Sequence, residues 1–147
     1  MINSFTCTDA GLVIRLVAFP DDAPVRGLWQ RWHDEQRVIV APTLLYYEVT
    51  NVIHRSRHAG LLSAGAATLA LDAALAIPIQ LHGDHALHLA ATKLAERFAL
   101  PAAYDAHYLA LAERLDAELW TADVRLARAV HVALPWVHHV AEVARGQ

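Results

Sequence analysis

Short apolar runs alternate with longer amphipathic stretches along almost the whole chain. The runs are rich in β-forming residues and end at turn-forming residues, which is typical of strands. Strands are predicted at residues 4–8, 37–41, 77–81, 118–122 and 136–140. The amphipathic stretches predict helices at residues 10–18, 25–36, 43–59, 63–76, 84–99, 102–115 and 124–130. Strands that alternate with helices indicate an α/β fold in which helices cover both faces of a parallel sheet.

Local signals mark several of these boundaries. Pro101 is expected to open the helix at 102–115, and Gly60 is expected to end the helix that starts at position 42 or 43. Ser63 and Asp123 are expected to cap the helices that follow them, because their side-chain oxygens can accept a hydrogen bond from the first turn. Pro78 lacks an N–H group, so it is expected either on an edge strand or at the start of the strand at 77–81.

The composition fits one folded domain over residues 1–147. Apolar residues make up 56% of the chain and charged residues 18%, which excludes an intrinsically disordered protein. Cys7 is the only cysteine, so an intramolecular disulfide and a Cys-rich metal site are excluded. The longest apolar region, residues 64–81, is interrupted by Asp72, and the first residues lack the basic start of a signal peptide. A soluble, cytoplasmic protein without a membrane span is expected.

The charge pattern limits how nucleic acid could bind. The net charge is −3, so there is no global basic field and any contact with nucleic acid must use a local patch. Arg55, Arg125 and Arg128 are candidates for contacts with RNA phosphates. The alternative is that these cations complement helix dipoles or are simply solvated.

Four carboxylates occur where an α/β sheet places its binding sites. Asp9 follows the first predicted strand, and Asp123 follows the strand at 118–122. Asp105 lies in the first turn of a predicted helix, and Glu48 lies on the flank of the helix at 43–59, beside the expected core positions 45, 49 and 52. Because ligands bind at the carboxyl ends of parallel strands, we expect the four to meet there. Taken singly, each is also explained as a cap, a turn residue or a solvated helix residue.

Four ionised carboxylates in one pocket need compensation, since like charges raise each other's pKa. A hard divalent cation removes the repulsion, and Mg²⁺ or Mn²⁺ suits a shell of carboxylates and water. Such an ion can activate water and stabilise the charge that develops on phosphorus. The candidate chemistry is therefore metal-dependent hydrolysis of phosphodiester bonds.

Three segments of the chain resemble the PIN-domain nucleases: residues 7–17 (CTDAGLVIRLV), 41–55 (APTLLYYEVTNVIHR) and 100–123 (LPAAYDAHYLALAERLDAELWTAD). They follow one another in the family's order and cover most of the chain, and the last is the most specific. The similarity is greatest to the VapC-type toxins of prokaryotic toxin–antitoxin pairs. The resemblance implies a three-layer α/β/α sandwich with a central parallel sheet of four to five strands. It also implies an endoribonuclease that depends on Mg²⁺ or Mn²⁺.

The resemblance also implies roles for individual residues. The implied metal ligands and catalytic residues are Asp9, Glu48, Asp105 and Asp123. Thr121 matches the small hydroxyl residue two places before the last Asp, and Asn51 matches the polar residue three places after the Glu. Both are expected to support the metal site.

Several partners follow from the same resemblance. A small antitoxin would inhibit the toxin by placing a segment over the acidic pocket, and the toxin would form a homodimer. Single-stranded or loop RNA is the expected substrate, because unstacked bases can be splayed out and read. The apolar face between Val25 and Trp32 is a candidate protein contact, and core packing is an equal alternative.

Gly11 departs from the family pattern, which usually has Ser or Thr two residues after the first Asp. That hydroxyl is expected to orient the Asp or a water molecule. Its absence suggests an alternative function, a catalytically weakened PIN-like module that binds RNA or a protein. A Gly11→Ser variant would separate the two functions by its effect on activity.

Overall fold

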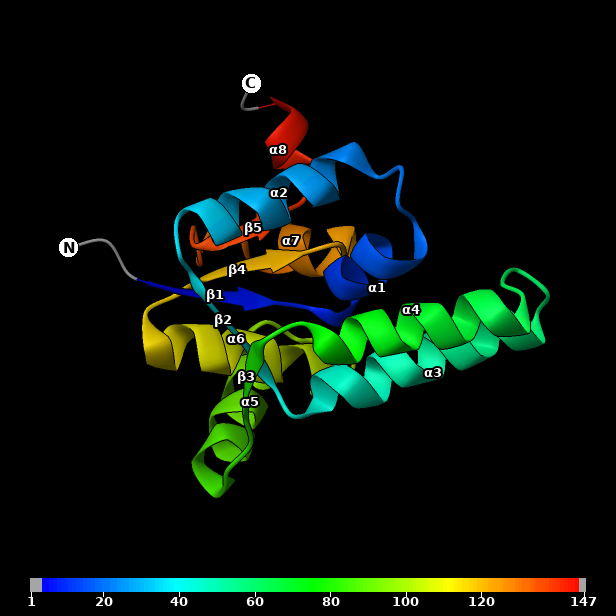
Figure 1. Cartoon of the computed structure of the whole chain (residues 1–147). Helices are drawn as coiled ribbons and strands as arrows, with labels where there is room; N and C mark the ends of the chain where they lie inside the picture. The colour runs from blue at the N-terminus through cyan, green and yellow to red at the C-terminus, as the bar shows by residue number, and fades with distance from the viewer. Residues whose placement is uncertain (1–3, 146–147) are drawn as a thin grey trace.

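A five-stranded sheet forms the centre of the computed structural model, which describes residues 4–145 (Figure 1). The strands are β1 (Phe5–Thr8), β2 (Val38–Pro42), β3 (Ile79–His82), β4 (Glu118–Thr121) and β5 (Val137–His139). Their order is β3-β2-β1-β4-β5, and every neighbouring pair is parallel. All five predicted strands and the parallel sheet are confirmed, and the strand that contains Gln80 lies at an edge as expected.

The helices connect the strands and cover the sheet. They are α1 (Ala10–Ala18), α2 (Ala23–Asp34), α3 (Leu44–His58), α4 (Ala64–Ala76), α5 (His85–Arg97), α6 (Tyr104–Leu115), α7 (Val124–Val130) and α8 (Glu142–Arg145). Ser63 and Asp123 cap α4 and α7 through side-chain oxygens, as predicted. The prediction that Pro101 opens α6 is wrong, because residues 101–103 form an irregular turn and the helix begins at Tyr104. Among residues 4–145, no helix is both long and apolar enough to span a membrane.

Helices lie on both sides of the sheet and give a three-layer α/β/α arrangement (Figure 1). α5 and α6 cover one face, while α2 and α8 cover the other. α3 and α4 pack against each other and against α1, and they project beyond the carboxyl edge of the sheet. This placement brings α3 and the start of α6 to the edge where β1 and β4 end.

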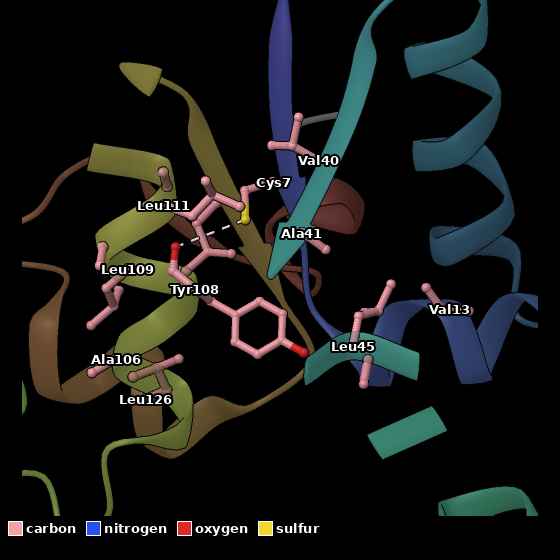
Figure 2. Packing of buried hydrophobic residues seen from close by; sticks show 14 of the residues in the cluster. Cys7, Val13, Val40, Ala41, Leu45, Ala106, Tyr108, Leu109, Leu111 and Leu126 are labelled. Carbon is pink, nitrogen blue, oxygen red and sulfur yellow. Dashed lines mark hydrogen bonds between the residues drawn. The ribbon is translucent and has the colours of Figure 1, made fainter. Parts of the chain in front are cut away.

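The sheet separates two hydrophobic clusters, one on each of its faces. Cys7, Val40 and Leu119 are neighbours in register and pack toward α6, where Cys7 Sγ lies 3.8 Å from the carbonyl oxygen of Tyr108 (Figure 2). Ile39 and Trp120 belong to a second cluster with α2. Burial raises the pKa of the Cys7 thiol far above its ordinary value, so Cys7 is a core residue, as expected for a strand cysteine.

α2 packs its apolar side into the second cluster. Val25, Leu28 and Trp32 are spaced to fall on one side of the helix, and they are 0, 1 and 2% exposed. The prediction that this face is a protein contact is therefore wrong, and the alternative of core packing is confirmed.

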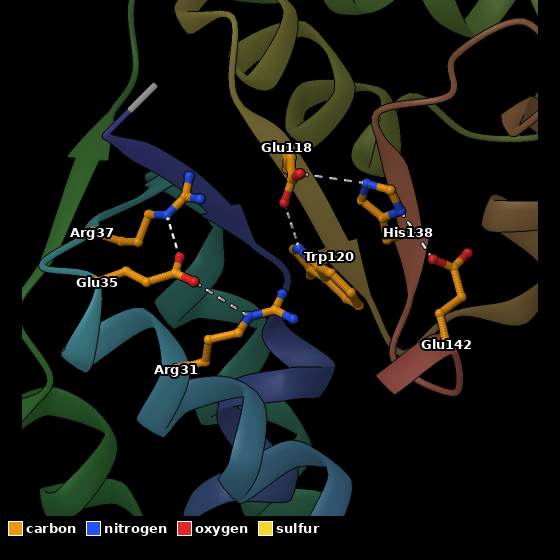
Figure 3. Close-up of polar contacts among 7 residues, drawn as sticks. All are labelled: Arg31, Glu35, Arg37, Glu118, Trp120, His138 and Glu142. Atoms are coloured by element: carbon orange, nitrogen blue, oxygen red, sulfur yellow. Dashed lines mark hydrogen bonds and ion pairs between the residues drawn. The ribbon is translucent and has the colours of Figure 1, made fainter. Parts of the chain in front are cut away.

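Polar side chains join β4, β5 and the C-terminal segment on the same side of the sheet (Figure 3). The indole of Trp120 donates to Glu118, and the ring of His138 lies 4.8 Å from that of Trp120. Nδ1 of His138 lies 2.9 Å from Glu142 at the start of α8. The guanidinium of Arg31 covers the Trp120 ring at 5.3 Å. These contacts tie α2 to β4 and α8 to the edge strand β5.

Gly60 ends α3 in the left-handed conformation, with a φ of 78°. Its N–H donates to the carbonyl of Arg57, and the N–H of Leu61 donates to the carbonyl of Ser56, which together form a Schellman motif.

The Gly60→Ala variant is expected to have a free energy of unfolding about 1 kcal/mol lower than the wild type, because a Cβ is strained at positive φ. Urea denaturation measures this loss. The matched control is Gly65→Ala within α4, where a Cβ meets nothing within 4 Å and stability should rise by about 0.5 kcal/mol. Equal effects of the two substitutions would contradict this prediction.

Candidate active site at the carboxyl edge of the sheet

Four carboxylates line one cavity of about 290 Å³ at the carboxyl ends of β1 and β4. They are Asp9, Glu48, Asp105 and Asp123. From β1 the chain adds β2 and β3 on one side of the sheet, and then adds β4 and β5 on the other side. The cavity therefore lies at the topological switch point of the sheet, between β1 and β4. The predicted convergence of the four side chains is confirmed as geometry.

Asp9 is held rigidly between β1 and β4. Its Oδ1 accepts from the N–H of Leu12 at 3.0 Å and caps α1, while its Oδ2 accepts from the N–H of Ala122 at 3.0 Å and from the hydroxyl of Thr121 at 2.5 Å. The Thr121 oxygen also accepts from the N–H of Asp123 at 2.9 Å. The buried Thr121 therefore links the Asp9 carboxylate to the backbone of Asp123.

Glu48 is oriented by a residue that the sequence analysis did not select. The hydroxyl of Tyr108 donates to Glu48 Oε1 at 2.6 Å across 60 positions of sequence. Tyr108 is 2% exposed, and in Figure 2 its hydroxyl points out of the core toward the start of α3. Tyr108 lies three residues after Asp105, which places the two on adjacent turns of α6. This three-residue spacing from Asp105 is the feature of the sequence from which a position for Tyr108 near the site could have been predicted.

The other two carboxylates are more accessible. Asp105 is half-buried in the first turn of α6. Asp123 is exposed, and its Oδ1 caps α7 by accepting from the N–H groups of Arg125 and Leu126 at 2.9 and 3.2 Å. Because the capping bonds use Oδ1, the second oxygen of Asp123 is available to a ligand.

Burial and mutual repulsion disfavour ionisation in the cavity. Burial raises the pKa of Asp9, Glu48 and Asp105 above the ordinary carboxyl range. The negative charge of Asp105 raises the pKa values of Asp9 and Glu48 further. The negative charge of Asp123 likewise raises the pKa of Asp105. Among the described residues that line the cavity, none is basic. The site therefore concentrates negative charge without a protein counter-charge.

The donor set fits a hydrated divalent cation. Within residues 4–145, no three Asp, Glu, His or Cys side chains are already arranged to hold a metal ion by themselves. Mg²⁺ ordinarily keeps several water ligands and binds through one or two carboxylates together with substrate phosphates. A cavity with only oxygen ligands and uncompensated negative charge therefore suits Mg²⁺ better than zinc, which prefers nitrogen or sulfur ligands.

Several residues expected at the site lie outside the cavity lining. Asn51 and Arg55 are exposed on α3, and Asn51 faces a neighbouring cavity instead. Arg125 and Arg128 are exposed on α7.

The prediction that Val52 belongs to the core is wrong, because Val52 lines the acidic cavity. The buried residues of α3 are Leu45, Val49 and Ile53.

Gly11 also lines the carboxylate cavity. A Cβ at this position would come within 3.0 Å of the Ala122 Cβ and 3.5 Å of Asp9 Oδ1. Ala122 is the residue whose N–H donates to Asp9. Any side chain at position 11 therefore presses on the segment that holds Asp9.

We expect Gly11→Ala and Gly11→Ser each to lower the free energy of unfolding by about 1 kcal/mol, because the crowding of Ala122 outweighs the gain of about 0.5 kcal/mol from replacing a glycine in a helix. The double variant Gly11→Ser/Ala122→Gly should recover most of this loss. Urea denaturation of all three proteins measures the effect. Full stability of Gly11→Ala would show that the contact with Ala122 relaxes without cost.

Comparison with known proteins identifies the family. The model of the PIN domain family matches residues 6–132. The crystal structure of PAE2754 from Pyrobaculum aerophilum is similar to this chain with a TM-score of 0.67 and 23% sequence identity, and the match covers 99% of this chain and 97% of that one. No curated protein matches the sequence. PIN domains are typically nucleases, and the nucleases generally use divalent metals. The chain belongs to the PIN domain family.

Proposed function

We propose that this protein is an endoribonuclease that hydrolyses RNA phosphodiester bonds with Mg²⁺ or Mn²⁺. The observation that carries the proposal is the shared cavity of four carboxylates, whose described lining includes no basic residue. A cation in this cavity would neutralise the repulsion and would attract an RNA phosphate that the bare carboxylates repel.

Each carboxylate has a separate part in this proposal. Asp9 would hold the cation from the sheet, because three hydrogen bonds fix its position. Asp105 and Asp123 would bind it from the open side, directly or through water. When bound, the cation supplies stabilisation of the charge that develops on the phosphoryl group.

Glu48 is the carboxylate best suited to accept a proton from the attacking water. Its pKa is raised by burial and by the charges of Asp105 and Asp9, which makes it a better base than an exposed carboxylate. The hydroxyl of Tyr108 fixes one of its oxygens and leaves the other for the water. Tyr108 is thus a positioning residue.

The biological role we propose is that of a VapC-type toxin, consisting of one PIN-like domain over residues 1–147. Support comes from the sequence motifs around Asp9, Glu48 and Asp105 and from the membership of the PIN family. In this role the protein acts in the cytoplasm as a homodimer, cleaves single-stranded or loop RNA, and is inhibited by a small antitoxin. Arg55, Arg125 and Arg128, which lie outside the cavity, are proposed contacts for distant RNA phosphates.

A second candidate function is a weakened module that binds RNA or a protein, and Gly11 is the observation behind it. The double variant Gly11→Ser/Ala122→Gly adds the hydroxyl without the crowding that a single substitution causes. A large gain in cleavage by this variant would favour the weakened module. Unchanged cleavage in a protein that is already active would dismiss it.

The nuclease is tested by incubating the purified chain with a panel of single-stranded and stem-loop RNAs in Mn²⁺ or Mg²⁺. Cleavage should stop in EDTA and in the Asp9→Ala variant. The matched control is Asp72→Asn, which removes an exposed carboxylate on α4 and should cleave normally. Cleavage that persists in EDTA or in Asp9→Ala would refute the proposed mechanism.

A further inference from the structure

Two further cavities adjoin each other along α3, which also lines the carboxylate cavity, and they share Thr43 and Tyr47. Their volumes are about 750 and 250 Å³. The larger runs along α3 and contains Asn51 and His54, and the smaller is bounded by the starts of α3 and α6 and by the end of β3. Among the described residues that line them, none is Asp, Glu, Lys or Arg. The walls are mostly apolar, with aromatic rings and the side chains of Leu44, Leu81 and Leu87, and they also carry imidazole, hydroxyl and amide groups.

Two exposed tyrosines face the smaller cavity. Tyr47 is 77% exposed and Tyr104 is 65% exposed, although both rings line the same cavity. The neighbouring Tyr46 behaves differently, because it packs against the core and its hydroxyl donates to the carbonyl of Ala74 at 2.9 Å. Neither Tyr47 nor Tyr104 contributes much to the fold, and both rings are available to a ligand.

The tyrosine pair and two of the carboxylates are neighbours on the same two helices, α3 and α6. Tyr47 directly precedes Glu48 in α3, and Tyr104 directly precedes Asp105 in α6. Tyr104 also lies one helical turn, about 6 Å along the axis, before Tyr108, whose hydroxyl binds Glu48. A ligand that touches both rings therefore lies close to the carboxylates.

The wall of the smaller cavity also offers hydrogen-bonding groups. His107 Nδ1 lies 2.8 Å from the carbonyl of Ala103 and therefore carries the proton of the neutral ring. Its Nε2 then accepts from Nδ1 of His88 at 2.9 Å. In the neutral pair, Nε2 of His88 is left as an acceptor.

We propose that Tyr47 and Tyr104 bind an unstacked nucleobase of the RNA strand whose phosphate is held at the carboxylate cavity. The inference rests on the proposed nuclease function and adds a base-binding subsite to it. Every base has a π-face that stacks on an aromatic ring, and the uncharged, mostly apolar walls suit a base rather than a phosphate. The subsite selects single-stranded RNA, because a paired base cannot reach the rings.

The test is a coupling experiment between protein and RNA. Asp105→Asn is the common background, so that the RNA stays intact during the measurement. The probes are single-stranded RNAs of about ten nucleotides, either complete or lacking one base at each position in turn. Their affinities are measured with Tyr47 and Tyr104 intact, with either changed to Ala, and with either changed to Phe. Leu69→Ala removes an equally exposed apolar side chain from α4 and serves as the control.

With both tyrosines intact, loss of the base at one position should weaken binding about 5- to 150-fold. That loss should shrink to less than about threefold in Tyr47→Ala or Tyr104→Ala, and it should persist in the Phe variants and in Leu69→Ala. Equal losses in all proteins, or no binding of RNA, would overturn the inference. Alanine variants that change only the oligomeric state would also overturn it and would assign the rings to a second copy of the chain.

The experiments test the nuclease function and the base-binding site independently of each other. If cleavage in the wild type is absent but the coupling is present, the nuclease function is wrong and the base-binding site stands. If cleavage depends on Asp9 but the coupling is absent, the nuclease function stands and the base-binding site is wrong.

Discussion

Replacement of Asp105 by asparagine is expected to lower the rate of RNA cleavage by about 10²- to 10⁴-fold, because the cation loses a charged ligand that contributes several kcal/mol to the transition state. Asp105 is chosen because, within residues 4–145, its side chain makes no hydrogen bond. Asparagine has nearly the same shape, so the fold is preserved. Single-turnover cleavage at saturating Mn²⁺ measures the effect.

The same substitution is expected to stabilise the metal-free protein by about 0.5–2 kcal/mol, since it removes repulsion by a half-buried carboxylate whose charge also raises the pKa of Asp9 and Glu48. Loss of activity with a gain in stability is the signature of a charge kept for function. Asp72→Asn, on the exposed side of α4, should change neither quantity. A less stable and inactive Asp105→Asn protein would instead indicate a structural role.

Divalent metal is expected to stabilise the wild-type protein strongly at neutral pH. At a concentration of Mn²⁺ about 100 times its dissociation constant, the gain is about 2.7 kcal/mol. In the proposed site Asp9 and Asp105 must lose their protons to bind the ion, and the ion also favours the ionised form of Glu48, so the gain should be larger at about pH 8 than at about pH 5. Urea denaturation with Mn²⁺ or with EDTA at the two pH values measures it.

The metal-free protein should show the opposite dependence on pH. Because the pKa of each of these three groups is raised on folding, the folded state binds more protons than the unfolded state above about pH 4. Stability in EDTA should therefore fall as the pH rises through the raised pKa values, and the loss is complete above them. The decrease should be smaller in Asp105→Asn. A wild-type protein that gains stability relative to this variant as the pH rises would contradict the prediction.

Much of the fold and the meeting of the four carboxylates could be predicted from the sequence. Short apolar strands between amphipathic helices indicate a parallel sheet, and a parallel sheet brings all its carboxyl ends to one edge. Asp9 and Asp123 follow neighbouring strands, so their approach requires only the correct strand order. Ser63 and Gly60 act within one turn of helix, so the start of α4 and the end of α3 are also predicted correctly from the sequence.

The remaining features depend on contacts between distant segments. The bond from Tyr108 to Glu48 joins residues 60 positions apart and cannot be read from either helix alone. The close approach of Gly11 to Ala122 depends on how α1 leaves β1. Asn51 matches the family pattern by its spacing from Glu48, but it lines the neighbouring cavity, because the packing of α3 decides which of its flanks faces the carboxylates.

The most direct test of the central claim is a single Mn²⁺ titration of the wild-type protein, in which RNA cleavage and thermal stability are both followed. If the carboxylate cavity holds the ion that supports cleavage, the two curves should share one midpoint. In Asp105→Asn both curves should shift to higher Mn²⁺ concentration, and in Asp72→Asn neither should move. Cleavage that saturates without any change in stability, or stabilisation by Mn²⁺ without cleavage of any RNA, would contradict the account.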